Sequence, residues 1–180
     1  MNLPHPLAFL PLSLRRPVFW SALVLTALCF ALFGLVLDPP LRSPLSSGIV
    51  SFELARTPQA AQAMLNAWDA RARLFVAFSL GFDFLFMPLY ATALSAALLL
   101  TAERLTGLSG GIANLLGWGA YLATLFDALE NIALFSILTG TLGSNPAIAF
   151  GCATIKFGLL LLACGYALFA RFFLQNRTGN

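Results

Sequence analysis

Long apolar runs separated by short polar segments dominate the sequence. Four of them, at about residues 18–37, 74–100, 112–139 and 147–170, are each long enough to cross a membrane as a helix, which takes about 20 apolar residues. Short turns join the last three runs, so neighbouring helices are expected to run in opposite directions. The pattern predicts an all-α membrane protein, an antiparallel four-helix transmembrane bundle, as a single domain over residues 1–180.

The first run has a competing interpretation. Residues 1–14 are broken by three prolines and are not expected to span, and Arg15-Arg16 then precede the apolar run. A basic pair before an apolar run is also typical of a secretory signal peptide. However, the run is long for such a peptide, and no clear small-residue cleavage site precedes Asp38. We therefore expect a membrane span.

Residues 38–73 form the longest hydrophilic segment. Prolines and serines make its first part irregular, but Thr57-Pro58 is a favourable helix start, with threonine at the N-cap and proline at the first helical position. Apolar residues then recur at helical spacing, at Ala61, Met64, Leu65 and Trp68. This predicts a short extramembrane amphipathic helix near residues 58–70, which either covers the end of the bundle or forms a lid over a site.

Composition supports the membrane class and excludes several others. The chain is 59% hydrophobic and 9% charged, with a mean hydropathy of +0.87, whereas soluble domains carry about 25% charged residues. The arginines are scattered, so we expect the lipid bilayer and no nucleic acid as partner. The single histidine, His5, excludes a bis-histidine haem and a histidine-rich metal site. We expect no cofactor and no metal.

Arginines also indicate the orientation of the chain. Four spans place both termini on one side of the membrane, together with five arginines: Arg15, Arg16, Arg104, Arg171 and Arg177. The other four arginines lie in the long loop. Because positive charges in short segments near the spans favour the cytoplasmic side, both termini are expected in the cytoplasm.

Polar side chains interrupt the last three spans. Asp127, Glu130 and Asn131 are spaced i, i+3, i+4, so a helix places them on one face, and Asp83 and Lys156 lie in the two other runs. Ionisable groups at membrane depth are costly and are expected to face a protein interior or a wet cavity with partners. These residues form the predicted buried polar site.

Their depth is the strongest evidence for a common site. Asp83, Glu130 and Lys156 each lie about nine residues from the loop-side end of their span, which is about 13 Å by helical rise. Asp127 is one turn deeper. Three helices that run in alternating directions thus bring their charges to one level.

Three acids face one base in this arrangement. An ion pair of Lys156 with Glu130 or Asp127 leaves two carboxyl groups, and we expect at least one acid to hold its proton near neutral pH. Such a network either locks the helices together or forms a functional site. The surplus of carboxyl groups favours a functional site, which also includes Tyr90, two turns beyond Asp83. Asn131 is expected to form a helix–helix hydrogen bond.

Several short motifs together resemble a family of small bacterial four-helix membrane proteins with no known activity. They are Ile49-Val50-x-Phe52-Glu53-x-Ala55, Trp68, Asp83-Phe84-x-Phe86 with Tyr90, Asp127-x-x-Glu130-Asn131 and Lys156-Phe157. The resemblance covers about residues 45–160. It implies a bacterial cytoplasmic membrane and places Glu53 over Lys156. A looser, architectural likeness to emopamil-binding sterol isomerases lacks the histidine expected of that family.

The leading functional hypothesis is a binding protein for a small amphipathic or lipid-like ligand, whose head group meets the buried polar site. Three alternatives stay open: an intramembrane acid/base enzyme acting on a lipid, a proton-coupled transporter, and an accessory subunit of a larger membrane complex. A homo-oligomer is also compatible with the sequence. Catalytic residues are not identifiable, because the sequence has no nucleophile constellation, phosphate loop or metal-ligand spacing.

Overall fold

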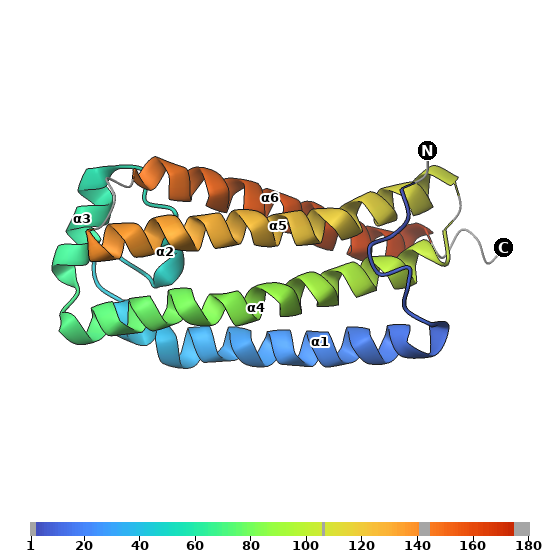
Figure 1. Ribbon diagram of the computed structural model, residues 1–180, viewed down its shortest axis with the longest axis horizontal. Helices are drawn as coiled ribbons and strands as arrows, with labels where there is room; N and C mark the ends of the chain where they lie inside the picture. The colour runs from blue at the N-terminus through green and yellow to red at the C-terminus, as the bar shows by residue number, and fades with distance from the viewer. Residues whose placement is uncertain (1–2, 106, 141–144, 175–180) are drawn as a thin grey trace. The chain divides into compact units, whose positions relative to one another are not determined.

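The computed structural model describes residues 3–105, 107–140 and 145–174, and these residues are mainly helical (Figure 1). The α-helices are α1 (Leu12–Leu32), α2 (Ile49–Glu53), α3 (Pro58–Ala67), α4 (Ala70–Ala102), α5 (Gly107–Thr139) and α6 (Pro146–Phe169). π-Helical turns at Phe33–Leu37 and Ala170–Leu174 follow α1 and α6, and Pro39–Leu41 form a 3-10 turn. The predicted all-α fold is confirmed.

Four of the helical segments are long and apolar enough to cross a membrane. They are Leu12–Leu37, Ala70–Ala102, Gly107–Thr139 and Pro146–Phe172. Each includes one of the four apolar runs of the sequence, and together they fit a multi-pass membrane protein. The first begins several residues earlier than predicted, at Leu12, and continues through Pro17.

The chain forms two compact units. Unit 1 comprises Met1–Thr26, Pro88–Thr124 and Phe157–Asn180, and unit 2 comprises Ala27–Met87 and Leu125–Lys156. The division passes through α4 at Pro88, although α4 itself continues from Ala70 to Ala102 through this proline.

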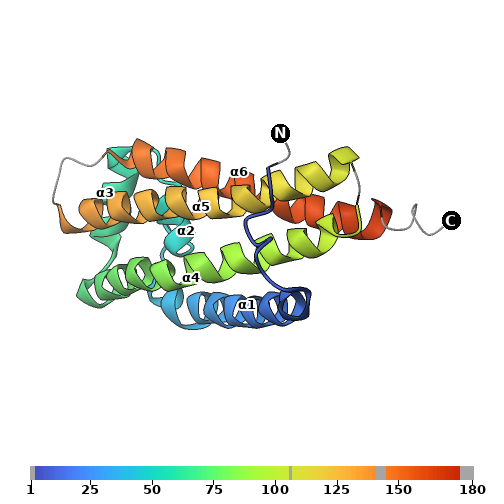
Figure 2. The ribbon, with the colours of Figure 1, turned by 45° about the vertical axis from the view of Figure 1, so that its right-hand side comes forward.

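In unit 1, the segment before α1 packs on the helices. Figure 2 shows it crossing α5 and α4. The indole Nε1 of Trp118 donates to the Pro4 carbonyl oxygen at 2.9 Å, and His5 is buried. A Cβ atom at Gly117 would collide with the His5 imidazole, so the glycine makes room for the ring. Tyr90 is also buried in this unit.

In unit 2, a core forms between the long helices and the loop that contains α2 and α3. Its buried members include Leu41, Phe52, Ala61, Leu65, Trp68, Val76, Leu80 and Leu134. In both views α3 lies across the start of α4 and the end of α5, with α2 further inside the unit (Figures 1 and 2). The apolar face predicted for residues 58–70 therefore packs on the bundle.

The ends of α3 follow the sequence closely. Thr57 is the N-cap, and its Oγ1 accepts a hydrogen bond from the Ala60 backbone N–H at 3.2 Å. The helix ends at Ala67, slightly before the predicted boundary. The loop before it differs more from the prediction. We expected an irregular segment there, but Ile49–Glu53 form α2, which carries one of the predicted site residues.

Candidate functional site

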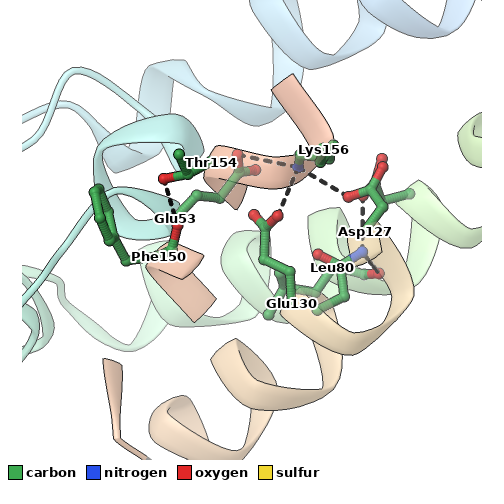
Figure 3. A network of polar contacts seen from close by, with 9 residues as sticks. Glu53, Leu80, Asp127, Glu130, Phe150, Thr154 and Lys156 are labelled. Atoms are coloured by element: carbon green, nitrogen blue, oxygen red, sulfur yellow. Dashed lines mark hydrogen bonds and ion pairs between the residues drawn. The ribbon is translucent and has the colours of Figure 1, made fainter. Parts of the chain in front are cut away.

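Lys156 is the centre of a buried charge cluster in unit 2 (Figure 3). Its Nζ atom donates to Asp127 Oδ1 at 2.9 Å and lies 2.9 Å from Glu130 Oε2. Glu53 Oε2 is a third carboxylate partner, at 3.4 Å from Nζ. We call Glu53, Asp127, Glu130 and Lys156 the charge cluster. The structure thus gives Lys156 both of the partners proposed for it from the sequence, together with Glu53.

The charge cluster is removed from solvent. Glu130 is 0% exposed, Asp127 2%, Lys156 4% and Glu53 6%. Asp127 and Glu130 are one helical turn apart on α5, so both face Lys156 on α6. With all four groups ionised, the cluster carries more negative than positive charge. Such an imbalance is costly in a low-dielectric interior unless further protons or donors are present.

Glu53 reaches the cluster from outside the four spans, at the end of α2. Asp38 holds the start of this helix, because its Oδ1 accepts a hydrogen bond from the Ile49 backbone N–H at 2.9 Å. Gly48 precedes Ile49 with φ of +144°, and a Cβ atom there would lie 2.8 Å from Asp38 Cγ. Only glycine combines this backbone conformation with so close an approach.

Aromatic packing secures the other side of α2. The Phe52 side chain is fully buried, and its ring meets Trp68 edge-on with the ring centroids 5.2 Å apart. Trp68 Nε1 in turn donates to the Leu41 carbonyl oxygen at 2.9 Å. These contacts direct the neighbouring Glu53 towards Lys156, the position that the family resemblance implied for it.

Burial changes the acidity of Glu53. Loss of solvation raises the pKa of its carboxyl above the ordinary value, the nearby Lys156 ammonium opposes this shift, and the Asp127 carboxylate adds to it. The Glu130 carboxyl group also lies close to that of Glu53. Glu53 is therefore a group that can hold a proton under conditions in which an exposed glutamate is ionised.

Asp83 and Asn131 form a second polar contact in unit 2. Asn131 Nδ2 donates to Asp83 Oδ2 at 2.7 Å and to the Leu80 carbonyl oxygen at 3.3 Å. This links α5 to α4, as expected for Asn131. Asp83 is only partly buried, and its carboxylate accepts this hydrogen bond from the amide.

Among the buried side-chain oxygens of unit 2 without a hydrogen-bond partner, two lie beside the charge cluster and are in no ion pair. They are Glu130 Oε1 and Asn131 Oδ1, on side chains that are 0% and 1% exposed. Buried polar atoms are normally paired, and each exception calls for a physical explanation. Here the arrangement has more acceptors than donors.

Six of the predicted site residues come together in unit 2. Glu53, Asp127, Glu130 and Lys156 form the charge cluster, and Asp83 pairs with Asn131, all in unit 2. Tyr90 belongs to unit 1. Asp38, which positions α2, was not recognised from the sequence. The glycine at position 48 was a usable signal, since it directly precedes the residue that Asp38 holds.

Within the described ranges, no three His, Cys, Asp or Glu side chains are grouped so as to hold a metal ion. Comparison with protein-family models, with curated proteins and with solved structures finds no match to this chain.

Proposed function

We propose that this protein binds a small amphipathic or lipid-like molecule within the membrane, with the head group of the ligand at the charge cluster. The observation that carries the proposal is the pair of buried acceptors without partners, Glu130 Oε1 and Asn131 Oδ1. A network that served only to join helices has no use for unsatisfied acceptors, because each costs free energy. A ligand with donor groups supplies what they lack.

The surroundings support the same proposal. Apolar spans provide a route for a molecule with a hydrocarbon tail, and the cluster provides a polar end. α2 brings Glu53 to the cluster from the loop between α1 and α4, so one member of the site comes from outside the four spans. The proposed location is a bacterial cytoplasmic membrane, with both termini in the cytoplasm.

Native mass spectrometry of the protein purified in a mild detergent tests the proposal. We expect a bound mass in the range of a lipid or small amphipath on the wild-type protein. The Asp127→Asn/Glu130→Gln variant, which keeps the shape of both side chains, should lose it. Thr154→Val is the matched control on α6, because the Thr154 hydroxyl bonds only the Phe150 carbonyl within that helix.

The proposal fails if the wild-type protein carries no bound mass and no added membrane lipid raises its melting temperature. A bound mass that persists in the double variant also contradicts it, since the ligand then sits elsewhere. Circular dichroism establishes that each variant is folded before its ligand content is compared.

Acid/base catalysis on a lipid is the second candidate function. The specific observation in its favour is the contrast between Glu53, whose pKa burial raises, and Asp127, whose carboxylate lies 2.9 Å from the Lys156 ammonium. Two carboxyl groups in unlike environments around one base are a frequent arrangement in general acid/base catalysis. Incubation with extracted membrane lipids should then yield a product that Glu53→Gln abolishes.

A further inference from the structure

The donors that face the charge cluster are already in use. The Lys156 ammonium contacts three carboxylates, and the Asn131 amide nitrogen donates to both Leu80 and Asp83. Glu130 Oε1 and Asn131 Oδ1 nevertheless have no partner. The charge cluster therefore has more carboxylates than ammonium groups, and these two oxygens have no donor; the buried Ser79 hydroxyl, which is also unpaired, carries no charge.

We infer that the head group of the ligand is an ammonium that carries N–H donors, such as a primary amine on a hydrocarbon chain. The inference rests on the proposed function and specifies its ligand class. An N–H-bearing cation satisfies both deficits at once, because it neutralises a carboxylate and donates to the unpaired oxygens. Asp83, the least buried of the four acids, provides a further carboxylate beside Asn131.

Other head groups leave one or both deficits unmet. A phosphate or carboxylate head brings negative charge towards Glu53, Asp127 and Glu130, and the one lysine is occupied by these residues. A hydroxyl head supplies one donor and no charge. A quaternary ammonium supplies charge without a donor, so the oxygen of Asn131 stays unpaired.

The test compares amphipaths that share one alkyl chain and differ only in the head: ammonium, trimethylammonium, alcohol and carboxylate. Binding to the wild-type protein in a non-ionic detergent is measured by native mass spectrometry and by the rise in melting temperature. We expect the ammonium amphipath to bind about tenfold more tightly than the trimethylammonium and alcohol forms, since hydrogen bonds to charged groups have this magnitude. The carboxylate form should give no rise.

Two variants locate the effect. Glu130→Gln should weaken binding of the ammonium amphipath by about tenfold, because it removes the charge that the head neutralises. Thr92→Val in unit 1 is the control and should leave the affinity unchanged, since its hydroxyl contacts Tyr121 and no member of the cluster. The head-group comparison uses wild-type protein, so it stands even where Glu130→Gln does not fold.

Three other results would overturn the ammonium inference, and one of them would also reject the proposed function. Equal binding of all four heads, lost in Glu130→Gln, overturns the ammonium inference and leaves the proposed function intact. A preference for ammonium that survives Glu130→Gln places the ligand elsewhere and overturns the inference. No binding of any amphipath, together with no bound lipid, rejects both, and protons then satisfy the excess acceptors.

Discussion

Lys156 is the residue on which the charge balance of the charge cluster depends. It is the single lysine of the sequence, it is 4% exposed, and three carboxylate oxygens lie within 3.4 Å of its Nζ. The attraction between buried charges offsets their loss of solvation only while the partners are present. Removal of the one cation therefore affects all three acids together.

Replacement of this lysine gives the first prediction. Lys156→Met keeps the length and the apolar stem of the side chain, and we expect it to lower the free energy of unfolding by up to about 3–5 kcal/mol. Protonation of an orphaned carboxyl moderates the loss, so acidic pH should partly restore stability. Adding Glu130→Gln or Asp127→Asn should recover stability at neutral pH. Thermal and denaturant unfolding in detergent measure each change.

The control for this prediction is Thr154→Val, which lies on the same helix outside the cluster and should melt like wild type. The prediction is wrong if Lys156→Met melts like wild type at every pH, because the ammonium then makes no net contribution to the folded state.

His5 leads to a pH prediction in unit 1. Burial, reinforced by the nearby Arg15, lowers its pKa from 6.5 to about 4, and its Nδ1 accepts a hydrogen bond from the Leu7 backbone N–H. The unfolded chain thus takes up a proton below pH 6.5 that the folded protein refuses until about pH 4. The stabilising contribution of neutral His5 is complete above pH 6.5 and decreases as the pH falls to about 4.

His5→Asn isolates this effect, because the amide oxygen can accept from Leu7 but the side chain does not titrate. We expect the stability of the variant to vary less than that of wild type between pH 6.5 and 4. The free energy of unfolding is measured against pH by chemical unfolding monitored by tryptophan fluorescence. Parallel curves for the two proteins would show that the pKa of His5 is the same in the folded and unfolded states.

At the scale of elements, α2 is the shortest α-helix of the described chain and depends most on tertiary contacts. It has five residues, and helices this short are not stable without tertiary contacts. Asp38 holds its first residue, Phe52 packs on Trp68, and Glu53 ends at Lys156. The loop is therefore attached to the charge cluster through one short helix with three contacts.

Gly48 tests how α2 is held. Gly48→Ala requires an L residue at φ of +144° and places a Cβ atom 2.8 Å from Asp38 Cγ, so we expect a loss of about 1–3 kcal/mol in the free energy of unfolding. Gly81→Ala is the matched control: a Cβ atom there meets nothing within 4 Å. Because alanine is the better helix former, the control should be neutral or slightly stabilising. Equal melting of both variants would mean that Asp38 does not fix α2.

At the scale of the whole molecule, hydropathy accounts for most of the architecture. The four spans are predictable because each apolar run is long, and Thr57 marks α3 through its cap. The depth of Asp127, Glu130 and Lys156 from the loop-side end of their spans is predictable by counting residues along helices of known rise. The hydrophobic pattern and the positions of the charges thus predict the helices and the depth of the charged residues along them.

The other features of the site depend on individual side-chain contacts, which leave no periodic pattern in the sequence. α2 is too short for a recognisable pattern, and Asp38, eleven residues earlier in the chain, is needed to start it. Depth places Asp83 close to Lys156, but it does not reveal that the Asn131 amide takes this carboxylate. The choice among partners at one depth is made by side-chain packing, which a single sequence does not encode in its spacing.

Four spans also predict the orientation of the chain. Reporter fusions should place a tag after residue 174 and a tag before residue 3 on the cytoplasmic side, and a tag inserted at Arg56, in the exposed loop before α3, on the opposite side. Fluorescent and phosphatase reporters distinguish the two sides. Opposite signals from the two termini would require an odd number of spans.

The order of synthesis gives the position of Lys156 a further meaning. Glu53, Asp83, Asp127 and Glu130 all precede the lysine, which lies in the last of the four spans. Chains emerge from the ribosome amino end first, so the acids enter the membrane before their cation exists. The last of the four spans is thus the one that supplies the cation of the charge cluster. A chain that lacks this last span therefore carries the buried acids without their lysine.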